Sequence, residues 1–163
     1  MRVMGIDPGS LCTGYGIVDE TGGKLSAVQW GGIRCRTKEP FARRLKTIYD
    51  ELVRLLRQYR PDTVAVEDLF FAVNAKSALK LGQTRGVVLL AAANENKPIG
   101  EYSPLEVKQS VAGYGRAAKE QVQGMVVRLL ALEKPPQPLD ASDALAIAIC
   151  HIHTANTQSR QRA

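Results

Sequence analysis

The stretch MGIDPGSLCTGYGIV, residues 4–18, decides the fold of this chain. Its apolar start continues the run at residues 2–6, which predicts a first β-strand. This strand is expected to end at Asp7, because Pro8 and Gly9 interrupt a regular ladder. An acid at the end of a strand lies at the edge of a sheet, where side chains from several elements can meet. The stretch therefore predicts a sheet with a carboxylate at its edge.

The rest of the chain predicts an α/β domain around a mixed sheet. Two strands at residues 13–19 and 25–34 are joined by a turn at residues 21–23, so they are expected to be antiparallel neighbours of the first. The short apolar run at 63–66 is expected to lie parallel to the first strand, because a helix connects them. A fifth strand is expected at 99–102. Helices are expected between Pro40 and Pro61, from Ala75 to Asn94, from Ser103 onward, at 118–132, and from Asp140 to about Thr154.

Composition limits the class of protein. A chain of 163 residues, of which 45% are apolar, is expected to form one domain over residues 1–156, followed by a disordered tail at 157–163. Three widely spaced cysteines without a CxxC pair predict reduced thiols and a cytoplasmic protein. No signal peptide or membrane-length apolar run is expected. The net charge of +6 fits a nucleic-acid partner but is weak evidence by itself.

Four acids occupy the ends of predicted elements: Asp7, Glu67, Asp140 and Asp143. Taken singly, each has a structural explanation, as a turn residue, a surface acid, or a pair of acids in the first turn of a helix. Their expected positions favour a shared site, because parallel strands would end side by side and bring Asp7 to Glu67. Clustered acids without neighbouring cations repel one another, and a divalent metal ion relieves that repulsion.

A carboxylate cluster of this kind suits phosphodiester hydrolysis. Two Mg²⁺ ions about 3.5–4 Å apart can activate a water and stabilise the leaving oxygen. The sequence has no Cys/His ligand cluster, which argues against zinc. His151 and His153 are expected to be ordinary residues on a helix face. In a basic chain, the acids predict metal-dependent chemistry on a polyanion.

The chain resembles the RuvC family of Holliday junction resolvases, which have a ribonuclease H-like fold. The resemblance runs from residue 1 to about 155. It implies a homodimer that nicks opposing strands of a four-way DNA junction symmetrically and leaves 5′-phosphate and 3′-hydroxyl ends. It also implies a partnership with the branch-migration proteins RuvA and RuvB. Four stretches carry it, in this order: MGIDPGSLCTGYGIV, VEDLFFAVNAKSALKLGQTRG, LEVKQSVAGYGRAAKEQVQGMV and PLDASDALAIAICH.

The resemblance assigns roles to individual residues. The four acids would be catalytic and bind two Mg²⁺ ions, with Asp7 bridging them and Mn²⁺ as an alternative metal. Lys108 and Lys119 would be catalytic and contact DNA near the scissile phosphate. Phe70, and with less support Phe71, would stack on unpaired bases, with packing into the core as the alternative. Further phosphate contacts of lower rank are expected at Lys76, Lys80, Arg85 and Arg116. Ser142 stands where the family usually has another small residue.

The predicted helix at residues 75–94 has a second feature. Gly82 and Gly86 lie four residues apart on one face, and glycine inside a helix costs about 1 kcal/mol. A close helix crossing would offset that cost, and the apolar end of the helix, residues 87–93, suits either a central buried position or a contact with a second subunit. The second possibility predicts a dimer contact.

The opening stretch also resembles the phosphate loop of actin-like ATPases and sugar kinases, but those proteins need two lobes and 163 residues supply one. A ribonuclease H-like nuclease acting on RNA or on hybrids stays an alternative. A non-catalytic junction-binding protein is another, although the presence of all four acids gives it no support.

Overall fold

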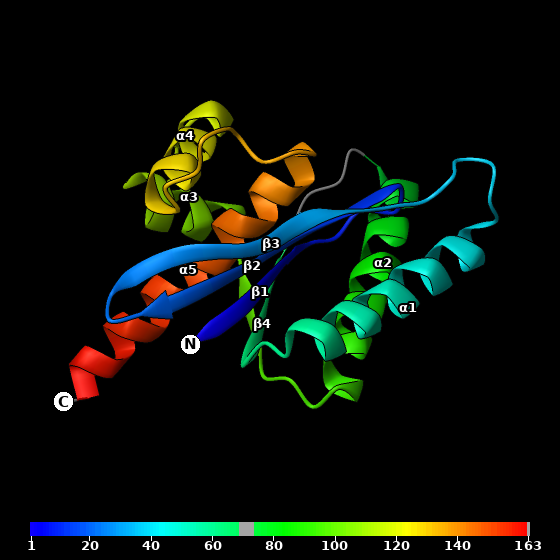
Figure 1. The fold of residues 1–163 in the computed structure, drawn as a ribbon. Helices are drawn as coiled ribbons and strands as arrows, with labels where there is room; N and C mark the ends of the chain where they lie inside the picture. Colours follow the sequence, from blue (N-terminus) through cyan, green and yellow to red (C-terminus); the bar gives the residue numbers. More distant parts are fainter. Residues whose placement is uncertain (69–73, 163) are drawn as a thin grey trace.

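A computed structural model describes residues 1–68 and 74–162 of the chain. It contains a five-stranded mixed sheet with helices on both faces (Figure 1), so the predicted α/β architecture is confirmed. The spatial order of the strands is β3-β2-β1-β4-β5. Their bounds are Arg2–Asp7 for β1, Cys12–Thr21 for β2, Lys24–Arg34 for β3, Thr63–Glu67 for β4 and Ile99–Tyr102 for β5.

Strand pairing follows the predicted pattern. Strands β1, β2 and β3 pair in antiparallel fashion, and β4 pairs in parallel with both β1 and β5. The hairpin between β2 and β3 turns on Gly22 and Gly23, whose φ angles of 59° and 84° lie in the region that favours glycine. The central strand β1 is therefore flanked by one antiparallel and one parallel neighbour.

Five helices surround the sheet within the described residues. Helix α2 begins and ends at the predicted residues, and Ser103 caps α3 through the predicted capping box. Helix α4 ends at Leu129, earlier than predicted. None of the helices in the described ranges is long and apolar enough to cross a membrane. Their bounds are Phe41–Tyr59 for α1, Ala75–Asn94 for α2, Pro104–Ala112 for α3, Lys119–Leu129 for α4 and Leu139–Arg162 for α5.

The predicted end of α5 at about Thr154 was wrong. The helix continues to Arg162. No proline or glycine follows Thr154 to stop it. Hydroxyls of this segment also donate to carbonyl oxygens one turn back, as Thr157 does to His153 and Ser159 to Ala155, both at 2.9 Å. The polar residues after Thr154 therefore form the last, solvent-exposed turns of α5.

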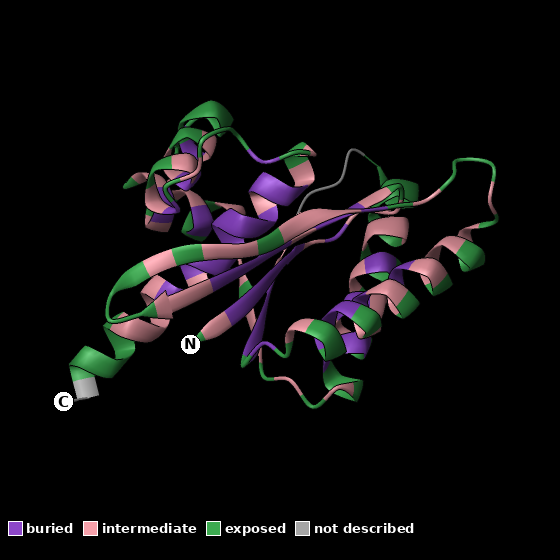
Figure 2. Cartoon of the chain, in the orientation of Figure 1, coloured by how far each residue is buried: buried purple, intermediate pink, exposed green. Residues whose placement is uncertain are grey.

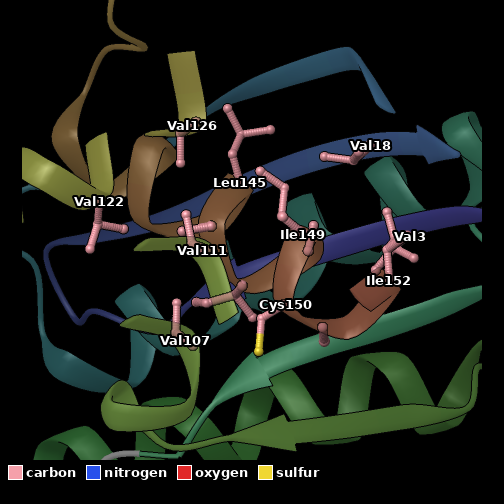
Figure 3. Close-up of a cluster of buried hydrophobic side chains, with 14 of the residues drawn as sticks. Val3, Val18, Val107, Val111, Val122, Val126, Leu145, Ile149, Cys150 and Ile152 are labelled. Carbon is pink, nitrogen blue, oxygen red and sulfur yellow. The ribbon is translucent and has the colours of Figure 1, made fainter. Parts of the chain in front are cut away.

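Two apolar clusters, one on each face, hold the sheet between its helices. Figure 2 shows buried residues along the central strands and on the helices that cover them. On the first face, Leu145, Ile149 and Ile152 of α5 pack between strand residues Val3 and Val18 and the smaller helices α3 and α4 (Figure 3). On the other face, β1, β2 and β4 direct apolar side chains toward α1 and α2. Successive residues of a strand point to opposite faces, which is why β1 and β4 are apolar along almost their whole length.

Helix α5 lies unusually close to the sheet because glycines face it. A Cβ atom added at Gly5 would lie 2.0 Å from the carbonyl oxygen of Ala144. A Cβ atom at Gly14 would lie 2.0 Å from the carbonyl oxygen of Asp140, and one at Gly16 would meet Leu145 at 2.7 Å. The start of α5 is therefore seated directly on β1 and β2.

Candidate active site

Parallel pairing brings two of the predicted acids to one edge of the sheet. The register of β1 and β4 places Ile6 opposite Val66, and the next residues along the two strands are Asp7 and Glu67. Both carboxylates are partly buried. The expectation that the two strands end side by side is confirmed.

The contact between α5 and the sheet supplies the other two acids. Gly14 is the partner of Asp7 in the antiparallel ladder, and the backbone of Asp140 rests on Gly14. Asp143 lies about one turn further along α5, on the same side of the helix. The contact at Gly14 thus places the start of α5, with Asp140 and Asp143, at the sheet edge where Asp7 lies.

The acids lie close enough to perturb one another. Burial raises the pKa of Asp7 to about 8, and the charges of Glu67, Asp143 and Asp140 contribute in that order. Burial also raises the pKa of Glu67 to about 7, with a further contribution from Asp143. Lys119 opposes both shifts. Clusters of acids with raised pKa values are typical of functional sites.

Two lysines complete the site. A pocket of about 220 Å³ is lined by residues that include Glu67, Asp143, Lys108 and Lys119. Lys119 Nζ lies 2.7 Å from Asp143 Oδ2, and this hydrogen bond raises the pKa of Lys119. The charge of Lys108 partly opposes the rise in the pKa of Glu67. The structure therefore brings both predicted lysines to the predicted acids.

The donor set suits a hard divalent cation, since every candidate ligand is a carboxylate oxygen. The side chains do not converge on one point, however: in residues 1–68 and 74–162 no three acids, histidines or cysteines are grouped closely enough to hold one ion. Asp143 is engaged by Lys119 in this arrangement. The charge of Asp143 nevertheless acts on both Asp7 and Glu67, so the three carboxylates are neighbours.

The other residues predicted to contact DNA differ in their surroundings. Phe70 and Phe71 lie outside the described residues. Lys76, Lys80 and Arg116 form no ion pair within the part of the chain that the structure describes, and Lys76 and Arg116 are exposed. Arg85 is different, because it pairs with Asp68 and Glu101.

Both histidines pack between α5 and its neighbours, in keeping with a structural role. His151 Nδ1 lies 2.8 Å from the Tyr102 hydroxyl, and burial lowers the pKa of this histidine. His153 Nδ1 lies 3.2 Å from both the hydroxyl and the carbonyl oxygen of Ser110.

Sequence reasoning missed one neighbour of the site, Cys12. Burial and then the adjacent Asp140 raise the pKa of this thiol to about 11. Cys12 begins β2 at the edge where β1 ends. Because Cys12 follows Pro8 by only four residues, its place near the end of β1 was predictable from the sequence. A single cysteine, however, is not a signal for a functional site.

The fold and the acids define a class of protein. A sheet in the order β3-β2-β1-β4-β5, with helices on both faces and a cluster of acids at one edge, is that of a ribonuclease H-like nuclease. The profile of one family, crossover junction endodeoxyribonuclease RuvC, matches residues 3–151. The chain belongs to the RuvC family. Nucleases of this family depend on divalent metal ions.

Individual relatives agree with this assignment. The chain is 53% identical over 156 residues to crossover junction endodeoxyribonuclease RuvC of Alkaliphilus oremlandii, covering 96% of this chain and 95% of the relative. It is 57% identical over 153 residues to that of Syntrophotalea carbinolica, covering 94% of each. Among solved structures, T. thermophilus RuvC in complex with a Holliday junction substrate is similar with a TM-score of 0.92 and 38% identity, covering 97% of this chain and 96% of the other.

Proposed function

We propose that the chain is a structure-specific endonuclease that resolves four-way DNA junctions by paired, symmetric nicks. The observation that carries the proposal is the gathering of Asp7, Glu67, Asp140 and Asp143 at one edge of the sheet. Membership of the RuvC family and similarity to a structure with a bound Holliday junction support the choice of substrate. Each cut would leave a 5′-phosphate and a 3′-hydroxyl.

In this proposal the four acids hold two Mg²⁺ ions, with Mn²⁺ as an alternative. Bound at the site, such ions supply an activated water and neutralise charge on the reacting phosphate. Asp7, on the central strand β1, would contribute to both ions. Asp143 would be one of the metal-holding acids, and Lys119, which now contacts it at 2.7 Å, would lie next to the reacting phosphate.

Lys108 and Lys119 then act on the substrate. Their ammonium groups line the pocket beside Glu67 and can stabilise negative charge that develops on the phosphate in the transition state. Lys76, Lys80 and Arg116, which have no acid partner in the described ranges, would contact phosphates further from the cut. Phe70 and Phe71 would stack on bases at the junction centre.

Paired nicks require two active sites, and α2 offers a surface for a homodimer. Leu79 and Leu90 are 66% and 53% exposed, and their spacing of three helical turns puts both on one face of α2. Nothing in the described chain lies within 4 Å of a Cβ atom added at Gly82 or Gly86. A second copy that packs on this face would offset the cost of both glycines and bury both leucines.

Three expectations about context stay predictions. These are an interaction with RuvA and RuvB, a cytoplasmic location, and a nuclease domain that comprises residues 1–156. The structure bears on the last only in that α5 continues past residue 156 as one helix.

The test is cleavage of a synthetic four-way junction whose strands are end-labelled one at a time, with and without Mg²⁺. Nicks at symmetric positions on opposing strands, present only with the metal, are expected. A linear duplex of the same sequence serves as the control and should stay intact. Tight, junction-selective binding without cleavage would favour a non-catalytic binding protein. Failure of both would make RNA–DNA hybrids the next substrates to examine.

A further inference from the structure

Arg85 lies in the middle of α2, and its charged side chain is only 19% exposed. Its Nε donates a hydrogen bond to the carbonyl oxygen of Glu67 at 3.2 Å. Its Nη2 lies 3.4 Å from Asp68 Oδ1 and also pairs with the Glu101 carboxylate. A guanidinium group has five N–H donors in one rigid plane, so it can hold several acceptors at once. Arg85 thus connects α2 to the ends of both β4 and β5.

These contacts lie at the end of β4, where its backbone is no longer paired with β1. The ladder between β1 and β4 runs only as far as Val66, one residue before Glu67. On the other side, β5 still holds the strand, because the Asp68 N–H donates to the carbonyl oxygen of Tyr102 at 2.7 Å. The Glu67 carbonyl accepts from Arg85 instead of from a strand. The backbone that carries the Glu67 carboxylate is therefore fixed by β5 and by Arg85.

The charges around Arg85 make it unsuited to a phosphate contact. Two carboxylates, Asp68 and Glu101, more than balance its single positive charge. A DNA phosphate would have to displace both acids and approach against their repulsion. Lys76 and Lys80, on the first turns of the same helix, have no such acid partner in the described ranges. The phosphate contact expected for Arg85 from the sequence thus gives way to a different role.

We propose that Arg85 is a positioning residue, which fixes the backbone of Glu67 so that its carboxylate stays with Asp7 and Asp143. This inference rests on the proposed function, because it takes Glu67 to be a catalytic acid. Arg85 lies on α2, the same helix that exposes Leu79 and Leu90 for contact with a second copy. One helix would thus contribute both to the dimer contact and to the position of Glu67. A misplacement of about 1 Å in a catalytic group can cost roughly a hundredfold in rate.

The decisive variant is Arg85→Lys, which keeps the positive charge but cannot hold three acceptors with one planar group. We expect its single-turnover rate of junction cleavage, measured at saturating protein with Mg²⁺, to fall roughly tenfold to a hundredfold. The Kd for the junction, measured without divalent metal, should stay within about twofold, because no phosphate contact is lost. A positioning role therefore separates rate from affinity.

Three further variants complete the experiment. Asp68→Asn and Glu101→Gln weaken the acceptors while they leave Arg85 in place, and each should lower the rate less than Arg85→Lys does. Arg57→Lys is the matched control, because Arg57 on α1 also holds an acid, Glu95, through two N–H groups at 3.0 and 2.8 Å. Its side chain is 70% exposed, and its acid partner Glu95 belongs to none of the strands that carry the candidate acids. Its rate should equal that of the wild type.

A second readout does not depend on the DNA substrate. Mg²⁺ is expected to raise the unfolding temperature of the wild type, and to raise that of Arg85→Lys less, because a displaced Glu67 binds the ion more weakly. If Mg²⁺ stabilises the wild type more than Arg85→Lys but the wild type does not cut junctions, the proposed function fails and the positioning role stands. If Arg85→Lys binds the junction more weakly yet cuts at the normal saturated rate, Arg85 is a phosphate contact. Tighter junction binding by Glu101→Gln, or equal behaviour of the two arginine variants in rate and metal response, would also overturn the proposal.

Discussion

At the scale of single residues, Asp7 occupies the centre of the candidate site. Burial and the charges of its three acidic neighbours raise its pKa to about 8. We expect Asp7→Asn to abolish junction cleavage, because an amide cannot supply the negative charge that a bridging ligand needs. Junction binding should persist or become tighter, since one repulsive charge near the DNA phosphates is removed. Labelled-junction cleavage beside a binding titration measures both effects; a variant that still cuts would exclude the bridging role.

The same residue predicts how stability depends on pH. Because the folded pKa of Asp7, about 8, lies above its unfolded value of 3.8, folding favours the protonated acid. This contribution to stability is complete below pH 3.8 and is lost as the pH rises through 8. Glu67, raised from 4.5 to about 7, acts in the same direction.

The expected result is an unfolding temperature of the metal-free protein that falls between pH 4 and 8. The dependence should be shallower in Asp7→Asn, and this variant should be the more stable of the two at pH 7. Thermal unfolding followed by circular dichroism in a chelating buffer is the measurement. Parallel curves for the two proteins would show that Asp7 ionises normally in the fold.

Ser142 is a buried residue without a visible use for its hydroxyl. Its side chain is 2% exposed, and Oγ has no hydrogen-bond partner in the described structure. A buried, unsatisfied hydroxyl costs about 1–3 kcal/mol, so Ser142→Ala should raise the free energy of unfolding by about 1 kcal/mol. Ser110→Ala is the opposite case, because that hydroxyl contacts His153 at 3.2 Å, and it should destabilise the protein. Chemical denaturation of both variants decides the matter; a loss of stability in Ser142→Ala would reveal a partner for the hydroxyl.

At the scale of elements, the seat of α5 on the sheet determines whether the acids meet. In Gly14→Ala, the added methyl group would collide with the Asp140 carbonyl oxygen, at 2.0 Å in the present geometry. We expect α5 to shift, at a cost of about 1–3 kcal/mol in unfolding free energy, and cleavage to fall more than the lost stability explains. Gly124→Ala in α4 is the control, because its surroundings are open and alanine favours a helix by up to about 1 kcal/mol. Equal cleavage by the two variants would mean that α5 tolerates displacement.

The elements themselves were largely predictable from local chemistry. Helix α2 has the predicted bounds because Asn74 caps its start, where the Ser77 N–H donates to the Asn74 side chain at 2.9 Å. The parallel pairing of β1 with β4, which ends both strands at one edge and brings Asp7 near Glu67, followed from the rule that a helical crossover makes strands parallel. The end of α5 was not predictable in the same way, because the polar residues after Thr154 suit a solvated helix as well as a coil.

Contacts between elements distant in sequence were harder to predict. Gly5 and Gly14 gave no local sign that α5 would rest on them, because the neighbours of a glycine are visible only in three dimensions. The acid partners of Arg85 were likewise not predictable, since Glu101 lies 16 residues away on another element. The composition of the site was thus accessible from the sequence, while the groups that hold it in place were not.

At the scale of the whole molecule, symmetric cleavage depends on two copies acting together, and α2 is the surface that we expect to join them. Leu90→Asp places a charge in the middle of an apolar contact, which should convert a dimer to a monomer. The fold should survive, because Leu90 is 53% exposed and its loss leaves the buried residues Val88 and Ala91 in place. Light scattering over a range of protein concentrations measures the oligomeric state.

Cleavage by this variant then separates the dimer from the chemistry. A monomer keeps all four acids, so single nicks are expected at high protein concentration, while the fraction of junctions cut on both opposing strands should fall sharply. Lys97→Asp, a charge change on the loop after the same helix and outside the Leu79 and Leu90 face, is the control and should leave paired nicks intact. Paired nicks from a Leu90→Asp protein that is monomeric in solution would mean that the junction itself brings the two copies together. Two copies bound to one junction have a high effective concentration relative to each other, which would replace the contact between the helices.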